Sequence, residues 1–270
     1  MNENLSLINT QEKKIITQMF LTLLPAQIFA SATASFSSII NGLVIGNCLS
    51  QDAMVALGFV TPITLILGAL SAIISGGGRV LFGRYLGRGN RDKLNEVFSN
   101  AIMTAIAIGF FLSAVIILFS DKIAYILGAR GEFIKSTALY IKGLAIGIIP
   151  TIVSPSLMVF LQLTEKANYA FASTLVLASS NLIFSLMNVK LLSGGIFGMG
   201  LATTVSQFIT LIFLAVKFFG KGRLLKFEPS KFNIKFSFAM CAFGSPAALA
   251  VVFYGLRNII LNNFAFDLEK

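Results

Sequence analysis

The chain is divided into long apolar blocks, each free of Asp, Glu, Lys and Arg. A helix that crosses a bilayer needs roughly 20 mostly apolar residues, and each block reaches that length. Charged residues make up 12% of the chain, whereas about a quarter is usual in soluble domains. We therefore expect an all-α integral membrane protein that crosses the bilayer several times, and we exclude a soluble enzyme. The seven blocks are residues 15–51, 53–78, 97–120, 143–164, 167–189, 191–216 and 236–256.

Lys and Arg residues are unevenly distributed between the segments that separate these blocks. If the N-terminus is cytoplasmic, 14 of them lie in or beside the inside segments and five in or beside the outside segments. Because short cytoplasmic loops of membrane proteins carry an excess of Lys and Arg, we predict a cytoplasmic N-terminus. The net charge of +10 then follows from topology and from attraction to anionic lipid, and it implies no nucleic-acid partner. The five outside residues are Lys122, Arg130, Lys135, Lys142 and Lys190.

A basic segment at residues 221–235 is typical of a linker between two domains. It holds five Lys or Arg residues and Pro229, the one proline outside an apolar block. Such a composition favours an exposed loop over a further span. We predict that this cytoplasmic linker joins a six-helix transmembrane bundle, residues 1–220, to the first helix of a second, truncated bundle, residues 236–270.

A short motif recurs on the two sides of that linker. Pro25-Ala26 is followed by Asn41, and Pro246-Ala247 is followed by Asn262 at the same separation. Transporters are often built from repeated bundles with the substrate path between them. The recurrence therefore predicts that the seventh span repeats the first one.

Uncharged polar side chains share one face on each of three spans. At 100° per residue, each group covers about a third of the helix circumference. Such residues either hold membrane helices together by packing and hydrogen bonds or line a cavity, and the sequence leaves both interpretations open. The groups are Gln27, Ser31, Ser35, Ser38 and Asn41; Thr174, Asn181, Ser185 and Asn188; and Thr203, Gln207 and Thr210.

The residue pattern indicates neither a metal site nor a cofactor. His is absent, and Cys48 and Cys241 are isolated in the sequence, so the usual metal ligands and a disulfide framework are not expected. The Gly76-Gly77-Gly78 run and the Gly83, Gly87 and Gly89 spacing are interpreted as a tight cytoplasmic turn and not as a phosphate-binding loop, because no strand precedes them.

Several motifs together resemble the multidrug and toxin extrusion (MATE) family of the flippase-exporter superfamily. The resemblance extends over the whole chain. It implies twelve helices in two six-helix lobes, in the plasma membrane of a bacterium, that export small organic compounds with inward movement of H⁺ or Na⁺ as the driving force. The motifs are Pro25 with IINGLVIG at 39–46, AMVALGFVTP at 53–62, GRYLGRGNRDK at 83–93, and Asn181 onward through GGIFGMGLATTVSQ at 194–207.

The resemblance also implies roles for single positions. Pro25 matches a proline associated with bending of the first helix, and Asn181 and Thr203 match polar positions that line the N-terminal lobe. Asn41 and Ser185 stand where many members of the family carry Asp. The usual carboxylate-based coupling therefore cannot operate on these residues, and either the coupling group lies elsewhere or this chain uses a different ion, substrate or direction. The resulting expectation is a water-accessible cavity lined by Gln27, Asn41, Asn181, Ser185 and Thr203.

Two other functions stay open at this point. A lipid-linked saccharide flippase of the same superfamily needs several inward-facing Arg or Lys residues for a pyrophosphate. Only Lys142, Lys190 and Arg257 lie near or within spans, so the exporter is favoured. A membrane scaffold subunit that transports nothing is the third interpretation, since the carboxylates are missing.

Overall fold

The computed structural model describes residues 39, 42–49, 51–164, 167–218 and 225–268. Within these ranges every regular element is a helix and none is a strand, so the predicted all-α class is confirmed. Most of the first predicted span, with Pro25, Gln27 and Asn41, lies outside the described residues. The elements are α2 Gln51–Leu86, α3 Arg91–Leu118, α4 Ser120–Ile126, α5 Phe133–Ala145, α6 Ile148–Leu163, α7 Ala167–Met187, the π-helix η1 Asn188–Leu192, α8 Gly195–Val216, the 3₁₀ helix η2 Pro229–Lys231 and α9 Ile234–Leu268.

Four of the described helices are long and apolar enough to cross a bilayer: α2, α3, α7 and α8. Two bent pairs raise this number to six if each pair is one span. The first pair is α5 with α6, bent by 47°, and the second is the two halves of α9, bent by 69° after Pro246. The chain is thus a multi-pass membrane protein, as the apolar blocks predict.

The span formed by α5 and α6 begins ten residues earlier than its apolar block. Helix α5 starts at Phe133, whereas the block starts at residue 143. The apolar block starts after Lys142 because each block was defined as free of charged residues. The Lys142 side chain, however, is 40% exposed, and its ammonium lies 3.9 Å from the Asp121 carboxylate. A lysine at the edge of a span can extend to the polar boundary, so it does not end the helix.

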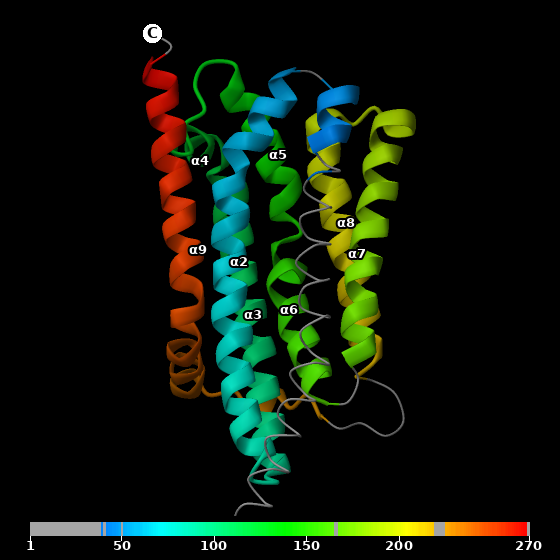
Figure 1. Cartoon of the computed structure of the whole chain (residues 1–270), viewed down its shortest axis with the longest axis vertical. Helices are drawn as coiled ribbons and strands as arrows, with labels where there is room; N and C mark the ends of the chain where they lie inside the picture. The colour runs from blue at the N-terminus through cyan, green and yellow to red at the C-terminus, as the bar shows by residue number, and fades with distance from the viewer. Residues whose placement is uncertain (1–38, 40–41, 50, 165–166, 219–224, 269–270) are drawn as a thin grey trace, which may run out of the picture.

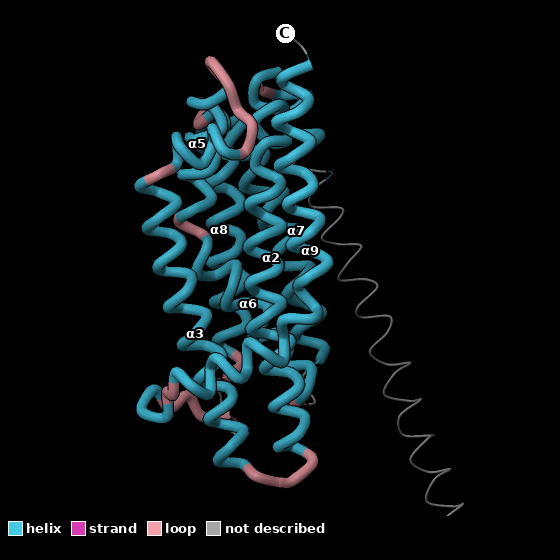
Figure 2. The backbone as a smooth tube through the Cα atoms, turned by 90° about the vertical axis from the view of Figure 1, so that its left-hand side faces the viewer, coloured by secondary structure: helices cyan, strands magenta, loops and turns pink. Residues whose placement is uncertain are grey.

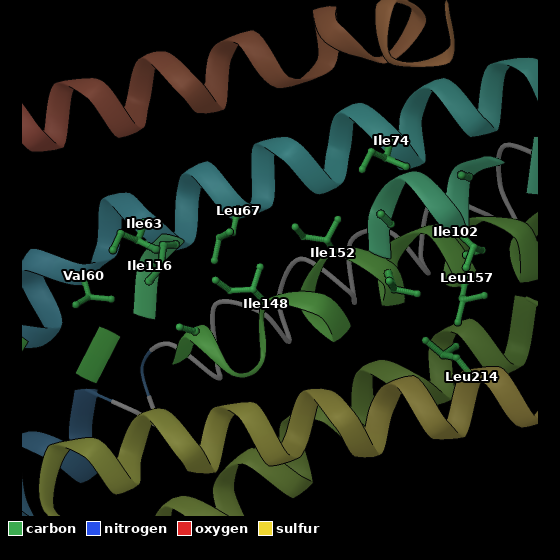
Figure 3. Close-up of a cluster of buried hydrophobic side chains, with 14 of the residues drawn as sticks. Val60, Ile63, Leu67, Ile74, Ile102, Ile116, Ile148, Ile152, Leu157 and Leu214 are labelled. Atoms are coloured by element: carbon green, nitrogen blue, oxygen red, sulfur yellow. The ribbon is translucent and has the colours of Figure 1, made fainter. Parts of the chain in front are cut away.

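The helices run side by side along the long axis of the molecule (Figures 1 and 2). Helix α2 lies between α9 on one side and α6 on the other, and α7 and α8 form a neighbouring pair (Figure 1). The core between them is filled by aliphatic side chains. In Figure 3, Leu67 and Ile74 of α2 face Ile148 and Ile152 of α6, and both α6 residues are 1% exposed or less.

The predicted glycine turn forms at residues 87–89, but the Gly76-Gly77-Gly78 run does not form a turn, so that part of the prediction is wrong. All three residues lie inside α2, at the place where α9 crosses it. A Cβ added at Gly77 would collide with the carbonyl of Met240, and one added at Gly244 of α9 would collide with the carbonyl of Ile73. Small residues let membrane helices approach until their backbones touch, and this is the role of the glycines here.

The far end of α9 is attached to the loop after α4 by polar contacts. The Nη2 atom of Arg130 donates to Asn263 Oδ1 at 2.8 Å, and Asn262 Nδ2 donates to the carbonyl of Leu127 at 3.3 Å. The Arg130 guanidinium also lies 4.0 Å from the centre of the Tyr125 ring. Helix α9 is therefore fixed to the preceding helices near both of its ends, because the start of α9 is bound to α3 as described below.

Candidate functional site

The turn between α7 and α8 fixes how the polar faces of these two helices meet. Helix α7 ends in the π-helix η1, and Ser193 (φ 48°) and Gly195 (φ 57°) have left-handed backbone conformations. The Asn188 amide donates to the carbonyl of Gly195 at 2.9 Å. It occupies the space where Gly194 and Gly198 lack a side chain, so any Cβ there would strike the amide. Asn188 therefore sets the register of the helix pair.

Helix α8 is held on its other side by an equally close contact with α5. A Cβ at Gly200 would lie 2.7 Å from the carbonyl of Tyr140, and one at Gly143 would lie 2.6 Å from the carbonyl of Phe197. The Thr204 hydroxyl donates to the carbonyl of Gly143 at 2.7 Å. Packing on both sides leaves α8 little freedom to rotate, so the direction of its polar face is well defined.

Asn181 of α7 and Thr203 of α8 meet across this helix pair. Asn181 Nδ2 donates to Thr203 Oγ1 at 3.2 Å, and the Thr203 hydroxyl donates to the carbonyl of Met199 at 3.3 Å. Asn181 is 4% exposed, and its Oδ1 atom has no hydrogen-bond partner among the described residues. A buried amide oxygen without a donor is costly, which marks it as a position where a further donor or a cation would be favourable.

Ser185 lies one helical turn beyond Asn181 on the same face of α7 and is fully buried. The other members of the predicted polar faces behave differently. Thr174 donates to the carbonyl of Phe171 at 2.8 Å, and Thr210 donates to the carbonyl of Ser206 at 2.8 Å. The hydroxyls of these two threonines are hydrogen-bonded within their own helices, which favours the packing interpretation over cavity lining. The structure thus joins Asn181 to Thr203, with Ser185 on the same face of α7 as Asn181, while Gln27 and Asn41 lie outside the described residues.

The helix pair that carries Asn181 and Thr203 contains no acidic residue. Between residues 167 and 216 the sequence has no Asp, Glu or His, and its one basic residue is Lys190. In the described part of the chain, no group of three His, Cys, Asp or Glu residues could hold a metal ion. The site can therefore offer neutral oxygen atoms and amide groups, but it cannot titrate near neutral pH.

Sequence reasoning missed a second polar cluster, at the start of α3. Asn95 accepts the backbone N–H of Lys226 at 2.9 Å, Ser99 accepts that of Glu228 at 2.8 Å, and Asn100 accepts that of Asn233 at 2.8 Å. The signal was present, because three polar residues stand within six positions at the edge of an apolar block. Their partners lie about 130 residues away in the linker, however, and no local pattern reveals such a pairing.

Comparison with known proteins identifies the family. The MatE family model matches residues 26–187. The multidrug export protein MepA of Staphylococcus haemolyticus is 27% identical over 265 residues, covering 94% of this chain and 56% of that protein. MepA of Staphylococcus aureus strain MSSA476 is 27% identical over 234 residues, covering 84% of this chain and 51% of the relative. The chain thus spans about half the length of the curated relatives that it matches.

Solved structures of transporters share the fold. The inward-facing conformation of a multidrug resistance MATE family transporter of the MOP superfamily has a TM-score of 0.78 at 18% identity, covering 84% of this chain and 52% of that one. The outward-facing conformation of a multidrug resistance MATE family transporter of the MOP superfamily also has a TM-score of 0.78 at 18% identity, covering 87% of this chain and 52% of that one. Because the family model matches more than half of the sequence, the chain belongs to the MatE family, the multidrug and toxin extrusion transporters that its motifs resemble.

Proposed function

We propose that this chain supplies the N-terminal lobe, and the first helix of a second lobe, of a secondary transporter that exports small organic compounds by alternating access. The observation that carries the proposal is the Asn181–Thr203 pair, a partly buried polar contact between two apolar spans of a MatE-family bundle. Neutral polar side chains between spans either hold helices together or line a path, and membership of this family favours the path here. The similarity to multidrug export proteins supports the same function.

The proposed lobes follow the division expected from the sequence. Residues 1–220 form the N-terminal six-helix lobe, residues 221–235 form the linker, and residues 236–270 belong to the second lobe. The close crossing of α9 on α2 at Gly244 and Gly77 is then a contact between the lobes. Alternating access requires the lobes to rock against each other, and a crossing without intervening side chains is a suitable pivot.

Of the two coupling ions considered, H⁺ and Na⁺, the described residues favour Na⁺. A proton needs a titratable group, and residues 167–216 contain no carboxylate or imidazole. Na⁺ needs only oxygen ligands such as backbone or amide carbonyls, and the Asn181 Oδ1 atom is buried without a partner in the described chain. We infer that Asn181 contributes to a Na⁺ path, together with Gln27, Asn41, Ser185 and Thr203 around a water-accessible cavity.

The neutral surroundings also bear on the substrate. Without a carboxylate nearby, a cationic drug gains little electrostatic attraction at this site. We infer that substrates are held mainly by apolar contacts and hydrogen bonds. The plasma membrane with a cytoplasmic N-terminus is the proposed location, supported by the bacterial relatives and by the distribution of Lys and Arg.

Transport by the product of the natural reading frame, reconstituted in proteoliposomes, tests this function. Export of an uncharged fluorescent organic probe is followed with an imposed Na⁺ gradient, and again with choline replacing Na⁺ at constant pH. We expect Na⁺-dependent export. The variant Asn181→Ala should lower the rate at least roughly tenfold, the effect of losing about 1.4 kcal/mol of binding.

The matched control lies on the same helix. Ser179→Ala removes an exposed hydroxyl that bonds only within α7, to the carbonyls of Leu175 and Val176, and export should not change. Export that is absent from the parent under every gradient, in correctly inserted protein, would contradict the transporter proposal and favour the scaffold interpretation. Export that persists unchanged in Asn181→Ala would be consistent with a transporter but would contradict the proposed path through Asn181.

A further inference from the structure

An apolar groove lies between α3, α6, α8 and the linker, and Asn181 is not among the residues that line it. Its volume is about 560 Å³, and helices α3, α6 and α8 together with linker residues Leu225–Glu228 form its walls. This volume falls within the range of roughly 300–1,000 Å³ that is usual for ligand pockets. In Figure 3, Ile102, Leu157 and Leu214 from the three helices lie close together at one end of the core, beside this groove.

The groove runs parallel to the helices. Its wall on α3 is made of Phe98, Ile102 and Ile106, and its wall on α6 is made of Ile149, Val153 and Leu157. Residues spaced by four lie above one another on a helix, so each wall extends about 12 Å along its helix axis at about 1.5 Å per residue. A straight, narrow, apolar groove of this orientation has the shape and the direction of a lipid acyl chain.

The linker end of the groove, which we take as its mouth, carries two charged residues of opposite sign. Lys226 lies there, exposed, and its ammonium forms no ion pair with a described residue. The other charged residue at the mouth is Glu228, which pairs with Lys231 at 2.7 Å. Glu228 is therefore largely neutralised, and Lys226 is left to determine the charge of the entrance.

The backbone around Lys226 is held in place before any ligand arrives. Asn95 and Ser99 of α3 accept the N–H groups of Lys226 and Glu228. Phe227 between them contacts the Phe98 ring at the same end of the groove, with centroids 6.4 Å apart. A charge on a fixed backbone loses little entropy when it binds a partner, so the mouth is suited to a specific contact.

We propose that this groove binds one acyl chain of an anionic phospholipid, with the lipid phosphate on the ammonium of Lys226. The apolar walls match the chain and the lysine matches the phosphate, because lysine binds phosphate as a compact positive charge. An organic cation is excluded as the occupant by its charge, since it would bring a second positive group to Lys226. The lipid would also hold the linker against α3, because Leu225–Glu228 form part of the site.

Tryptophan fluorescence tests the proposal, because the chain has no native Trp. Ile106→Trp places one reporter at the end of the α3 wall farthest from Lys226, at a position that is 40% exposed, in protein reconstituted into vesicles that contain phospholipid with brominated acyl chains. Bromine quenches Trp only at short range, so quenching measures occupancy. Phosphatidylglycerol is compared with phosphatidylcholine of the same chain length. One lysine near an anionic lipid surface corresponds to a preference of about fivefold for the anionic lipid.

Two controls separate this site from ordinary lipid contact. Phe111→Trp puts a reporter on the same helix at a 66% exposed position outside the groove, where both lipids should quench equally. Lys226→Gln should bring the preference at Ile106→Trp to about one, whereas Lys235→Gln, an exposed lysine outside the groove, should not change it.

Three results would overturn the proposal. Equal quenching of the Ile106→Trp reporter by both lipids, with Lys226 present, would mean unselective lipid contact. A preference that survives in Lys226→Gln would place the recognition elsewhere. Absence of quenching by either lipid, while the Phe111→Trp reporter is quenched, would mean that protein fills the groove.

Discussion

Asn100 of α3 accepts the backbone N–H of Asn233 at 2.8 Å, just before the start of α9, and so connects two parts of the chain that are 133 residues apart. The same fully buried amide donates to the carbonyl of Lys231 at 3.1 Å and accepts the hydroxyl of Ser237 at 3.2 Å. One side chain thus organises the end of the linker and the first turn of α9. The entry of α9 into the bundle is fixed by α3 and not by the linker alone.

Replacing Asn100 by Ala should destabilise the protein. The carbonyl of Lys231 and the N–H of Asn233 would lose their partner, and each buried group left unpaired costs roughly 1–3 kcal/mol. The midpoint of thermal unfolding, followed by circular dichroism in detergent, should fall clearly. Asn95→Ala is the control, because Asn95 makes one linker bond at an exposed position, and it should have a small effect. Equal midpoints for the two variants would contradict the central role of Asn100.

Gly77→Ala should push α9 away from α2. The new methyl group would meet the carbonyl of Met240, and overpacking of this kind costs typically 1–3 kcal/mol. Gly68→Ala is a matched control on the same helix, because a Cβ at Gly68 meets nothing within 4 Å. That control should be neutral or slightly stabilising, since Ala favours a helix over Gly. Thermal midpoints of the two variants give the comparison, and a stable Gly77→Ala would be evidence against the close crossing.

The glycine run shows where sequence reasoning reached its limit. In soluble chains consecutive glycines usually mark turns, and by that rule Gly76-Gly77-Gly78 predicts a turn. In a bilayer the backbone must stay hydrogen-bonded, so a helix continues through glycine and uses it for close packing. The choice between turn and helix depends on α9, which is far away in the sequence and cannot be seen locally.

The candidate site was more accessible to prediction, because helix periodicity needs only local information. The 100° rule placed Asn181 and Ser185 on one face, and the structure brings that face against Thr203 of α8. Periodicity could not separate these residues from Thr174, which lies on the same predicted face but bonds to its own helix. That difference depends on the neighbouring helix and on side-chain conformation, and neither is encoded in the spacing.

Cysteine labelling tests the orientation of the chain. The loop between α2 and α3 should be cytoplasmic, since it is rich in Arg and Lys. Two positions in this loop, Arg88 and Asn90, could carry a new Cys. Arg88 is chosen, because Asn90 caps α3 by accepting the N–H of Lys93. Cys48 and Cys241, the two free cysteines, are first changed to Ser. An impermeant maleimide should label Arg88→Cys only after the cells are opened. Labelling in intact cells would reverse the predicted topology.

The last prediction concerns position 41, which lies outside the described residues and is Asn where the family resemblance implies Asp. Asn cannot titrate, so export should depend little on protonation at this position. The variant Asn41→Asp introduces a carboxyl group that can bind and release a proton, so it should gain a pH dependence that the parent lacks. Export from proteoliposomes at a series of pH values, under a fixed Na⁺ gradient, measures this difference.

The proposal of a neutral N-terminal lobe is wrong if export by the parent already changes steeply with pH and substitutions within residues 1–220 abolish that change. Such a result would mean that a proton carrier lies within residues 1–220, whose apolar blocks contain no carboxylate. If the dependence instead maps to residues beyond 220, the neutral N-terminal lobe stands and the proton carrier belongs to the second lobe.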